Sequence, residues 1–153
     1  MIGGNFRLHE LQAAFLRVKL RHLDPALKKR RENAVRLIRQ LQEKWNAVFP
    51  AERCVCEGES KNLVQRSSGD VLLPFVCQEK SEHTWNQFVI RLVGEGKRDG
   101  WRQKLAKEGI QSEIYYPRSM HEQACFTDGK TDRFPAAEAF AKEVLALPLA
   151  LFL

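Results

Sequence analysis

The chain has 153 residues, of which 44% are hydrophobic and 29% are charged, and its formal net charge is +6. This length suffices for one domain with a hydrophobic core, and the composition excludes a disordered chain. No apolar run approaches the roughly 20 residues that a membrane-spanning helix needs, and the first residues do not resemble a secretory signal peptide. We therefore expect a cytoplasmic protein without a membrane partner.

Two helices are predicted at the start of the chain. Apolar residues recur at three- and four-residue steps over about residues 8–23, in a stripe formed by Leu8, Leu11, Phe15, Val18 and His22. Asp24-Pro25 is typical of an N-cap followed by proline at the first helical position. A second helix is then predicted to run to about Ala47, with an apolar side formed by Leu27, Ala34, Ile38, Leu41, Trp45 and Val48.

The positive charge lies mainly on these two predicted helices. Residues 1–48 contain eleven Lys or Arg against four Asp or Glu, whereas the remaining residues contain fourteen against fifteen. A basic segment of this kind can face nucleic acid or an acidic partner, or it can be the solvated side of a helix. We favour the solvated helix and expect no nucleic-acid partner.

The next segment, residues 50–70, is polar and irregular, and it forms either a short strand around Cys54 or a loop. The chain contains four cysteines, which is too few for a disulfide scaffold of this size. Cys54-Val55-Cys56 resembles half of a zinc site, but no second Cys or His pair follows at a matching spacing. We expect reduced thiols and no metal.

Two strands and a helix are predicted after this segment. Val71 to Cys77 is predicted to form an edge strand, because Pro74 cannot donate to a sheet. The alternation of apolar and polar residues from Trp85 to Val93 is the strongest strand pattern, with Phe88, Ile90 and Leu92 on one side. Asp99 is then predicted to cap a helix that ends at Glu108, followed by Gly109 at the C′ position.

The last part is predicted to form a strand from Ile110 to Tyr116 and a helix that Pro135 opens. The apolar side of that helix comprises Phe140, Val144 and Leu147. The whole order of elements predicts an α+β fold in which helices pack on a small, mainly antiparallel sheet.

A few residues suit ligand binding. Asn5 and Arg7 lie between two glycines and a helix start, where amide and guanidinium donors fit a phosphate, although Asn5 can equally be a helix cap. His121 lies in a loop and can bind or exchange protons, or be a surface histidine without a role. The sequence has no nucleophile elbow and no phosphate-binding loop, so we assign no catalytic residue.

Four segments, spread in order over nearly the whole chain, resemble one family. The segments are Gly3-Gly4-Asn5-Phe6-Arg7-Leu8 with Glu10-Leu11-Gln12-Ala13-Ala14, His83-Thr84-Trp85-Asn86-Gln87-Phe88-Val89-Ile90-Arg91, Tyr115-Tyr116-Pro117 with His121-Glu122-Gln123, and Phe134-Pro135-Ala136-Ala137-Glu138. Read together, they are similar to the C-terminal part of the DegT/StrS family of sugar aminotransferases, whose members are more than twice as long.

The resemblance implies a fold and an activity. Residues 1–153 would be the small C-terminal domain of a fold-type-I pyridoxal phosphate (PLP) aminotransferase, with residues 1–48 as leading helices and the large domain absent. The complete enzyme would transfer an amino group, typically from glutamate, to a nucleotide-linked keto sugar, and it would be a homodimer. The family's Schiff-base lysine, which lies upstream, matches nothing here, and the family continues beyond the point where this chain stops. We therefore expect the chain to be truncated at both ends and inactive alone.

The resemblance also implies roles for four residues. Asn5, with Arg7 as its companion, matches the asparagine that reaches the PLP phosphate of the other subunit. His121 matches a histidine that lines the sugar-nucleotide site, with Tyr116 beside it. Ser119 departs from the family's usual proline, which we expect to shift the His121 loop. Two alternatives stay open: a non-catalytic subunit of a split enzyme, and a basic helical binding module.

Overall fold

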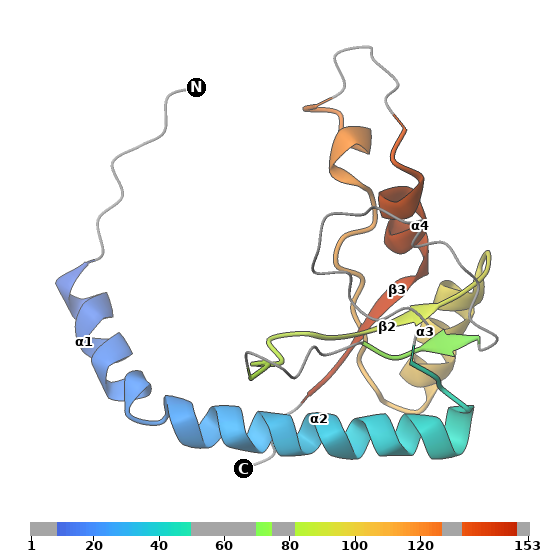
Figure 1. Ribbon diagram of the computed structural model, residues 1–153. Helices are drawn as coiled ribbons and strands as arrows, with labels where there is room; N and C mark the ends of the chain where they lie inside the picture. The colour runs from blue at the N-terminus through green and yellow to red at the C-terminus, as the bar shows by residue number, and fades with distance from the viewer. Residues whose placement is uncertain (1–8, 50–69, 75–81, 127–132, 150–153) are drawn as a thin grey trace.

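The computed structural model describes residues 9–49, 70–74, 82–126 and 133–149. In this part of the chain, two leading helices are followed by a three-stranded sheet with further helices on it (Figure 1). The elements are α1 (Glu10–Leu20), α2 (Leu23–Trp45), β1 (Val71–Leu72), β2 (Phe88–Leu92), α3 (Lys97–Lys107), the 3₁₀ turn η1 (Met120–Glu122), α4 (Pro135–Glu143) and β3 (Val144–Leu147). The predicted α+β class is confirmed.

The two leading helices form as predicted, but their junction differs. The N-cap of α2 is His22, and its side chain makes no capping hydrogen bond. Asp24 and Pro25 therefore belong to the first turn, where a missing N–H leaves no helical hydrogen bond unmade. The predicted apolar side of α2 is confirmed, because Ala34 and Leu41 are buried against the sheet.

The sheet has the order β1-β2-β3, and both pairs are antiparallel. β2 is the central strand, with Phe88 opposite Leu147 and Ile90 opposite Leu145. β1 lies at the edge, as predicted from Pro74, but it ends at Leu72, so the predicted strand was too long; its residues 75–77 lie outside the described residues. The antiparallel sheet is thus confirmed.

The alternation along β2 divides the domain into a core and a second face. Phe88, Ile90 and Leu92 are fully buried and join α2 and α3 in one hydrophobic cluster, in which the Trp45 and Trp101 rings lie 4.4 Å apart. Their neighbours Val89 and Arg91 point to the other side of the sheet, where the first contacts a cavity and the second contacts α4. β2 therefore contributes one face to the hydrophobic core and the other to the candidate site.

The predicted strand from Ile110 to Tyr116 is wrong. The structure has a single antiparallel bridge there, in which Glu113 and Ala146 exchange hydrogen bonds of 3.0 and 2.8 Å. The Ile110 N–H is not free for a ladder, because it donates to Leu105 at the end of α3. This bond and the left-handed Gly109 (φ 76°) form a Schellman motif, which confirms the predicted helix end.

The start of α3 also differs from the prediction. The N-cap is Gly96, with φ 71°, and the helix begins at Lys97, two residues before the predicted cap. Asp99 lies in the first turn and accepts a 2.9 Å hydrogen bond from the side chain of Arg98, which is compatible with the helix dipole but is not a cap.

The last predicted helix is too long. α4 opens at Pro135 as predicted but ends at Glu143, and Val144 takes an extended conformation (φ −85°, ψ 141°). Val144 and Leu147 were predicted on the helix face but belong to β3, whose residues pair with β2. The strand forms instead of a longer helix because pairing with β2 satisfies the N–H and C=O groups of this buried backbone.

α1 stands away from the rest of the fold in Figure 1. It has no buried residue, and five large apolar side chains are exposed on it: Leu11, Phe15, Leu16, Val18 and Leu20. Among the described residues, no helix is long and apolar enough to span a membrane. The part of this stripe that the structure describes is therefore not covered by the other described residues.

Candidate functional site

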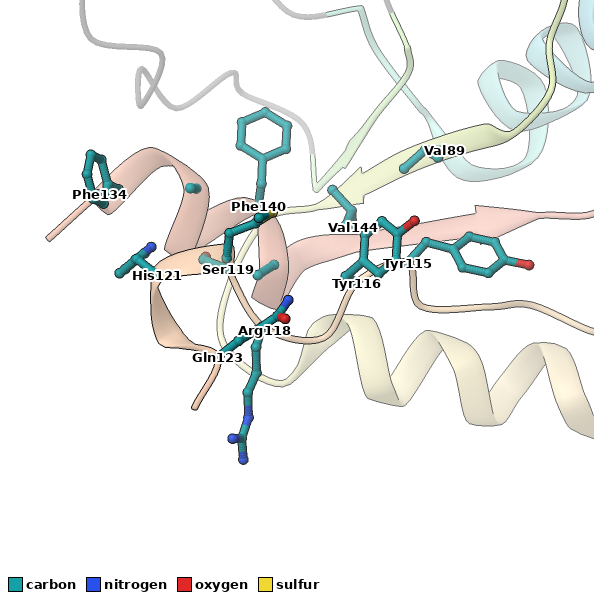
Figure 2. Close-up of a pocket in the computed structure, with 13 residues that line it drawn as sticks. Val89, Tyr115, Tyr116, Arg118, Ser119, His121, Gln123, Phe134, Phe140 and Val144 are labelled. Carbon is teal, nitrogen blue, oxygen red and sulfur yellow. The ribbon is translucent and has the colours of Figure 1, made fainter. Parts of the chain in front are cut away.

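A cavity of about 690 Å³ lies on the second face of the sheet and brings together two of the four predicted site residues. His121 and Tyr116 both line it, from the loop and turn between α3 and α4 (Figure 2). Its wall comes from β2, this loop, α4 and β3, and consists of Val89, Tyr115, Tyr116, Arg118, Ser119, Met120, His121, Gln123, Phe134, Ala137, Phe140, Ala141 and Val144. Asn5 and Arg7 lie outside the described residues.

The cavity is mostly apolar with a few polar groups at its rim. Val89, Phe140 and Val144 contribute hydrocarbon from the sheet and α4. Tyr116 is 73% exposed, so its phenol is open to solvent and to a ligand. A volume of several hundred Å³, an apolar wall and a small number of polar groups are typical of small-molecule sites.

His121 is held at the cavity wall by two residues at the start of α4. Its Nε2 lies 3.3 Å from Oε1 of Glu138, and its ring meets the Phe134 ring edge-on at 4.9 Å. Only 22% of the imidazole is exposed. The imidazole is therefore a placed group rather than a loose surface histidine.

Glu138 is itself anchored. Its Oε1 accepts the Phe134 N–H at 3.0 Å, and its other oxygen lies 3.6 Å from the Arg133 guanidinium. The pKa of Glu138 is lowered from 4.5, chiefly by the Phe134 N–H and further by His121 and Arg133. A lowered carboxyl pKa stabilises the fold above the unfolded value, so this contribution is lost as the pH falls through the lowered value.

Ser119 places a buried hydroxyl at the start of η1, on the cavity wall. Its backbone N–H donates to the Glu122 carboxylate at 2.9 Å, which fixes the entry to η1. Its hydroxyl is buried and has no hydrogen-bond partner among the described residues. Because an unpaired buried hydroxyl costs about 1–3 kcal/mol, a ligand or water that reached it would gain a hydrogen bond.

An ion pair supports the cavity from behind. Arg91 of β2 donates to Glu143 of α4 at 2.6 Å, and the other oxygen of Glu143 accepts the Gly94 N–H at 3.3 Å. The same guanidinium lies 4.7 Å from the centre of the Phe140 ring, which is a cation–π contact. Phe140 is thus fixed between the cavity and a charged pair.

No other chemical centre is found in the described part of the chain. Its titratable side chains form no cluster that could hold a metal ion, and its cysteine, Cys125, is exposed and free. Cys54, Cys56 and Cys77 lie outside the described residues. On the basic helix α2, Arg31 forms an ion pair with Glu82, so part of this charge is used within the fold.

The sequence and the structure both match known proteins. The DegT/DnrJ/EryC1/StrS aminotransferase family matches residues 1–55 and 59–152. A dTDP-3-amino-3,6-dideoxy-alpha-D-galactopyranose transaminase of Aneurinibacillus thermoaerophilus is 30% identical over 96% of this chain and 32% of its own length. A UDP-N-acetyl-3-dehydro-alpha-D-glucosamine 3-aminotransferase of Acidithiobacillus ferrooxidans is 32% identical over 97% of this chain and 32% of its own.

Solved structures give the same picture. DesV of S. venezuelae, in complex with a ketimine intermediate, has a TM-score of 0.71 and 28% identity over 95% of this chain and 32% of its own. The likeness confirms the predicted fold class, which the chain shares with part of an aminotransferase structure. The chain spans about a third of the length of the relatives that it matches.

Proposed function

The chain belongs to the DegT/DnrJ/EryC1/StrS aminotransferase family, and from this we propose that its 153 residues form the substrate-contacting C-terminal part of a PLP-dependent sugar aminotransferase. The complete enzyme transfers an amino group, typically from glutamate, to a nucleotide-linked keto sugar in the cytoplasm. The observation that carries the proposal is the meeting of His121 and Tyr116 in one apolar cavity.

The cavity suits the substrate class. Aromatic side chains can cover the apolar faces of a sugar or a base, while the imidazole, the phenol and the Ser119 hydroxyl can bond its hydroxyl groups. The matched relatives act on sugars linked to dTDP and to UDP. We therefore limit the proposal to a nucleotide-linked keto sugar and leave the carrier open.

The cofactor part of the proposal rests on the sequence match. PLP supplies the electron sink that transamination needs. Asn5 and Arg7 are proposed to hold its phosphate, from the opposite subunit of a homodimer. The lysine that binds PLP is proposed to lie outside these 153 residues, so the chain itself contributes binding and orientation but no covalent chemistry.

The function is tested by joining the chain to a lysine-bearing partner. The purified chain with PLP and glutamate is expected to show no Schiff-base absorbance and no turnover. Co-expression with the lysine-bearing two thirds of a family member is expected to restore both, with a nucleotide-linked keto sugar as acceptor. Turnover by the chain alone, or no turnover with any partner, would contradict the proposal.

In the restored enzyme, His121→Ala is expected to raise the KM of the sugar nucleotide about tenfold, the effect of losing one hydrogen bond worth about 1.4 kcal/mol. Lys107→Ala is the control, because it removes an exposed side chain at the end of α3, away from the cavity and from the stripe on α1. Equal KM values for the two variants would exclude His121 from the substrate site.

The exposed face of α1 is proposed to pack on the lysine-bearing part. Phe15 is 71% exposed, and its apolar neighbours on α1 are exposed as well. Contiguous exposed apolar side chains of this kind mark interaction surfaces. The match to only a third of each relative's length leaves the remaining two thirds of that fold as the partner.

Phe15→Glu tests this surface. The variant is expected to change the unfolding free energy of the chain by less than about 0.5 kcal/mol, because the ring contacts solvent, and to abolish co-purification with the lysine-bearing part. Arg17→Gln is the control, since it changes the charge of the same helix by one unit away from the stripe. Normal pairing of Phe15→Glu would contradict this interface.

A further inference from the structure

Glu138 contacts both the His121 imidazole and the Phe134 backbone, and the family resemblance assigned it no role. One carboxylate oxygen, Oε1, lies 3.0 Å from the Phe134 N–H and 3.3 Å from Nε2 of His121. We propose that Glu138 is a positioning residue that fixes the His121 imidazole at the cavity wall. This inference rests on the proposed function, because it gives His121 a ligand to meet.

The local structure around His121 explains why a second residue is needed. The imidazole sits on η1, a turn of three residues, none of which is buried. Short 3₁₀ turns have weak hydrogen-bond geometry and little packing of their own. The carboxylate, which is 17 residues further along the chain, joins this turn to the first turn of α4.

The start of α4 is a firm anchor. Pro135 occupies the first helical position, and the Glu138 N–H donates to Phe134 O at 3.0 Å while the carboxylate returns to the Phe134 N–H. The Phe134 ring lies 4.9 Å from the His121 imidazole, centre to centre, and limits its movement on that side. The His121 ring is therefore held by the Glu138 carboxylate and the Phe134 ring, and both of these come from the start of α4.

The arrangement also fixes the chemical face that His121 presents. In a neutral imidazole, an acceptor oxygen at Nε2 favours a proton on that nitrogen, and Nδ1 can then accept from a ligand hydroxyl. The carboxylate is only 16% exposed, so solvent competes weakly for it. A ligand then meets an oriented imidazole and loses less rotational freedom on binding.

The competing explanation is that Glu138 only caps α4. Four variants separate the two roles: Glu138→Ala, Glu138→Gln, His121→Ala and the double Ala variant. Pro135→Ala is the control for a loosened helix start, because it leaves the carboxylate in place. Each is made in the 153-residue chain and studied by NMR, with dTDP-glucose and UDP-N-acetylglucosamine as the titrated probes.

With Glu138→Ala we expect the cross-peaks between the His121 and Phe134 rings to disappear and the probe Kd to rise about three- to tenfold. Glu138→Gln should keep both properties within about twofold, since its amide oxygen accepts the same two N–H groups. The double variant should bind no more weakly than His121→Ala, because Glu138 acts through His121. Pro135→Ala should keep the cross-peaks.

Two results would overturn the positioning role. One is that the ring cross-peaks survive in Glu138→Ala, and the other is that the two alanine effects on Kd simply add. If wild type and His121→Ala bind both probes alike, the proposed function of the cavity fails instead, while the ring cross-peaks still decide where Glu138 places the imidazole.

Discussion

A Phe88→Ala variant is expected to lose about 3–5 kcal/mol of unfolding free energy. The Phe88 ring is fully buried in the central strand, where it lies beside Trp85 at 5.4 Å and opposite Leu147 on β3. Removing it takes away apolar contact area and leaves a cavity that the paired strands cannot close. Urea denaturation followed by tryptophan fluorescence measures the loss.

Phe126→Ala is the control for this substitution. It removes the same side chain at a position that is 56% exposed, so its effect should stay within about 0.5 kcal/mol. Since domains are stable by only about 5–15 kcal/mol, most molecules of the Phe88→Ala variant should be unfolded at moderate urea concentrations. A loss below about 1 kcal/mol would show that the sheet is not the centre of the core.

The sheet that Phe88 stabilises also shapes the cavity. Val89 follows Phe88 directly and points to the opposite face, where it lines the site. Changes in the core should therefore reach ligand binding only by unfolding or by moving the strand, whereas changes on the cavity face can alter binding at nearly constant stability. This separation is what allows the site variants to be interpreted.

Much of the fold could be predicted from local patterns. The helical repeats, the alternation of β2 and the Gly109 helix end are signals carried by neighbouring residues, and the structure confirms them. The strand from Val144 to Leu147 could not be predicted in this way. Phe140, Val144 and Leu147 have helical spacing, and only pairing with β2 decides that the helix stops at Glu143.

The candidate site was predictable only in part. The family resemblance selected His121 and Tyr116, and the structure places both on one cavity. Glu138 was present in a quoted segment but had no assigned role, because its contact with His121 depends on how two turns meet in space. The remaining signal in the sequence is Pro135 followed three residues later by a glutamate, which indicates a helix start and nothing more.

The Arg91–Glu143 pair was also invisible in the sequence, yet it predicts a large effect. Glu143→Ala is expected to lower the unfolding free energy by about 3–5 kcal/mol, because it leaves the Arg91 charge without a partner in a poorly solvated place. The two side chains are only 14% and 16% exposed. The Gly94 N–H would lose its acceptor at the same time.

The ion pair allows a sharper test. Removing one partner of a buried pair lowers the stability strongly, whereas replacing both partners by apolar residues costs little. Glu95→Ala removes a nearby exposed carboxylate and should change the stability by less than about 0.5 kcal/mol. Replacing both partners, as Arg91→Met with Glu143→Leu, should recover most of the loss, since hydrocarbon of similar volume needs no counter-charge.

Urea denaturation compares the wild type with these three variants, and probe titration shows whether Phe140 keeps its place at the cavity without the guanidinium beside it. A double variant as unstable as Glu143→Ala would mean that the carboxylate acts through the Gly94 turn, and not through the charge of Arg91.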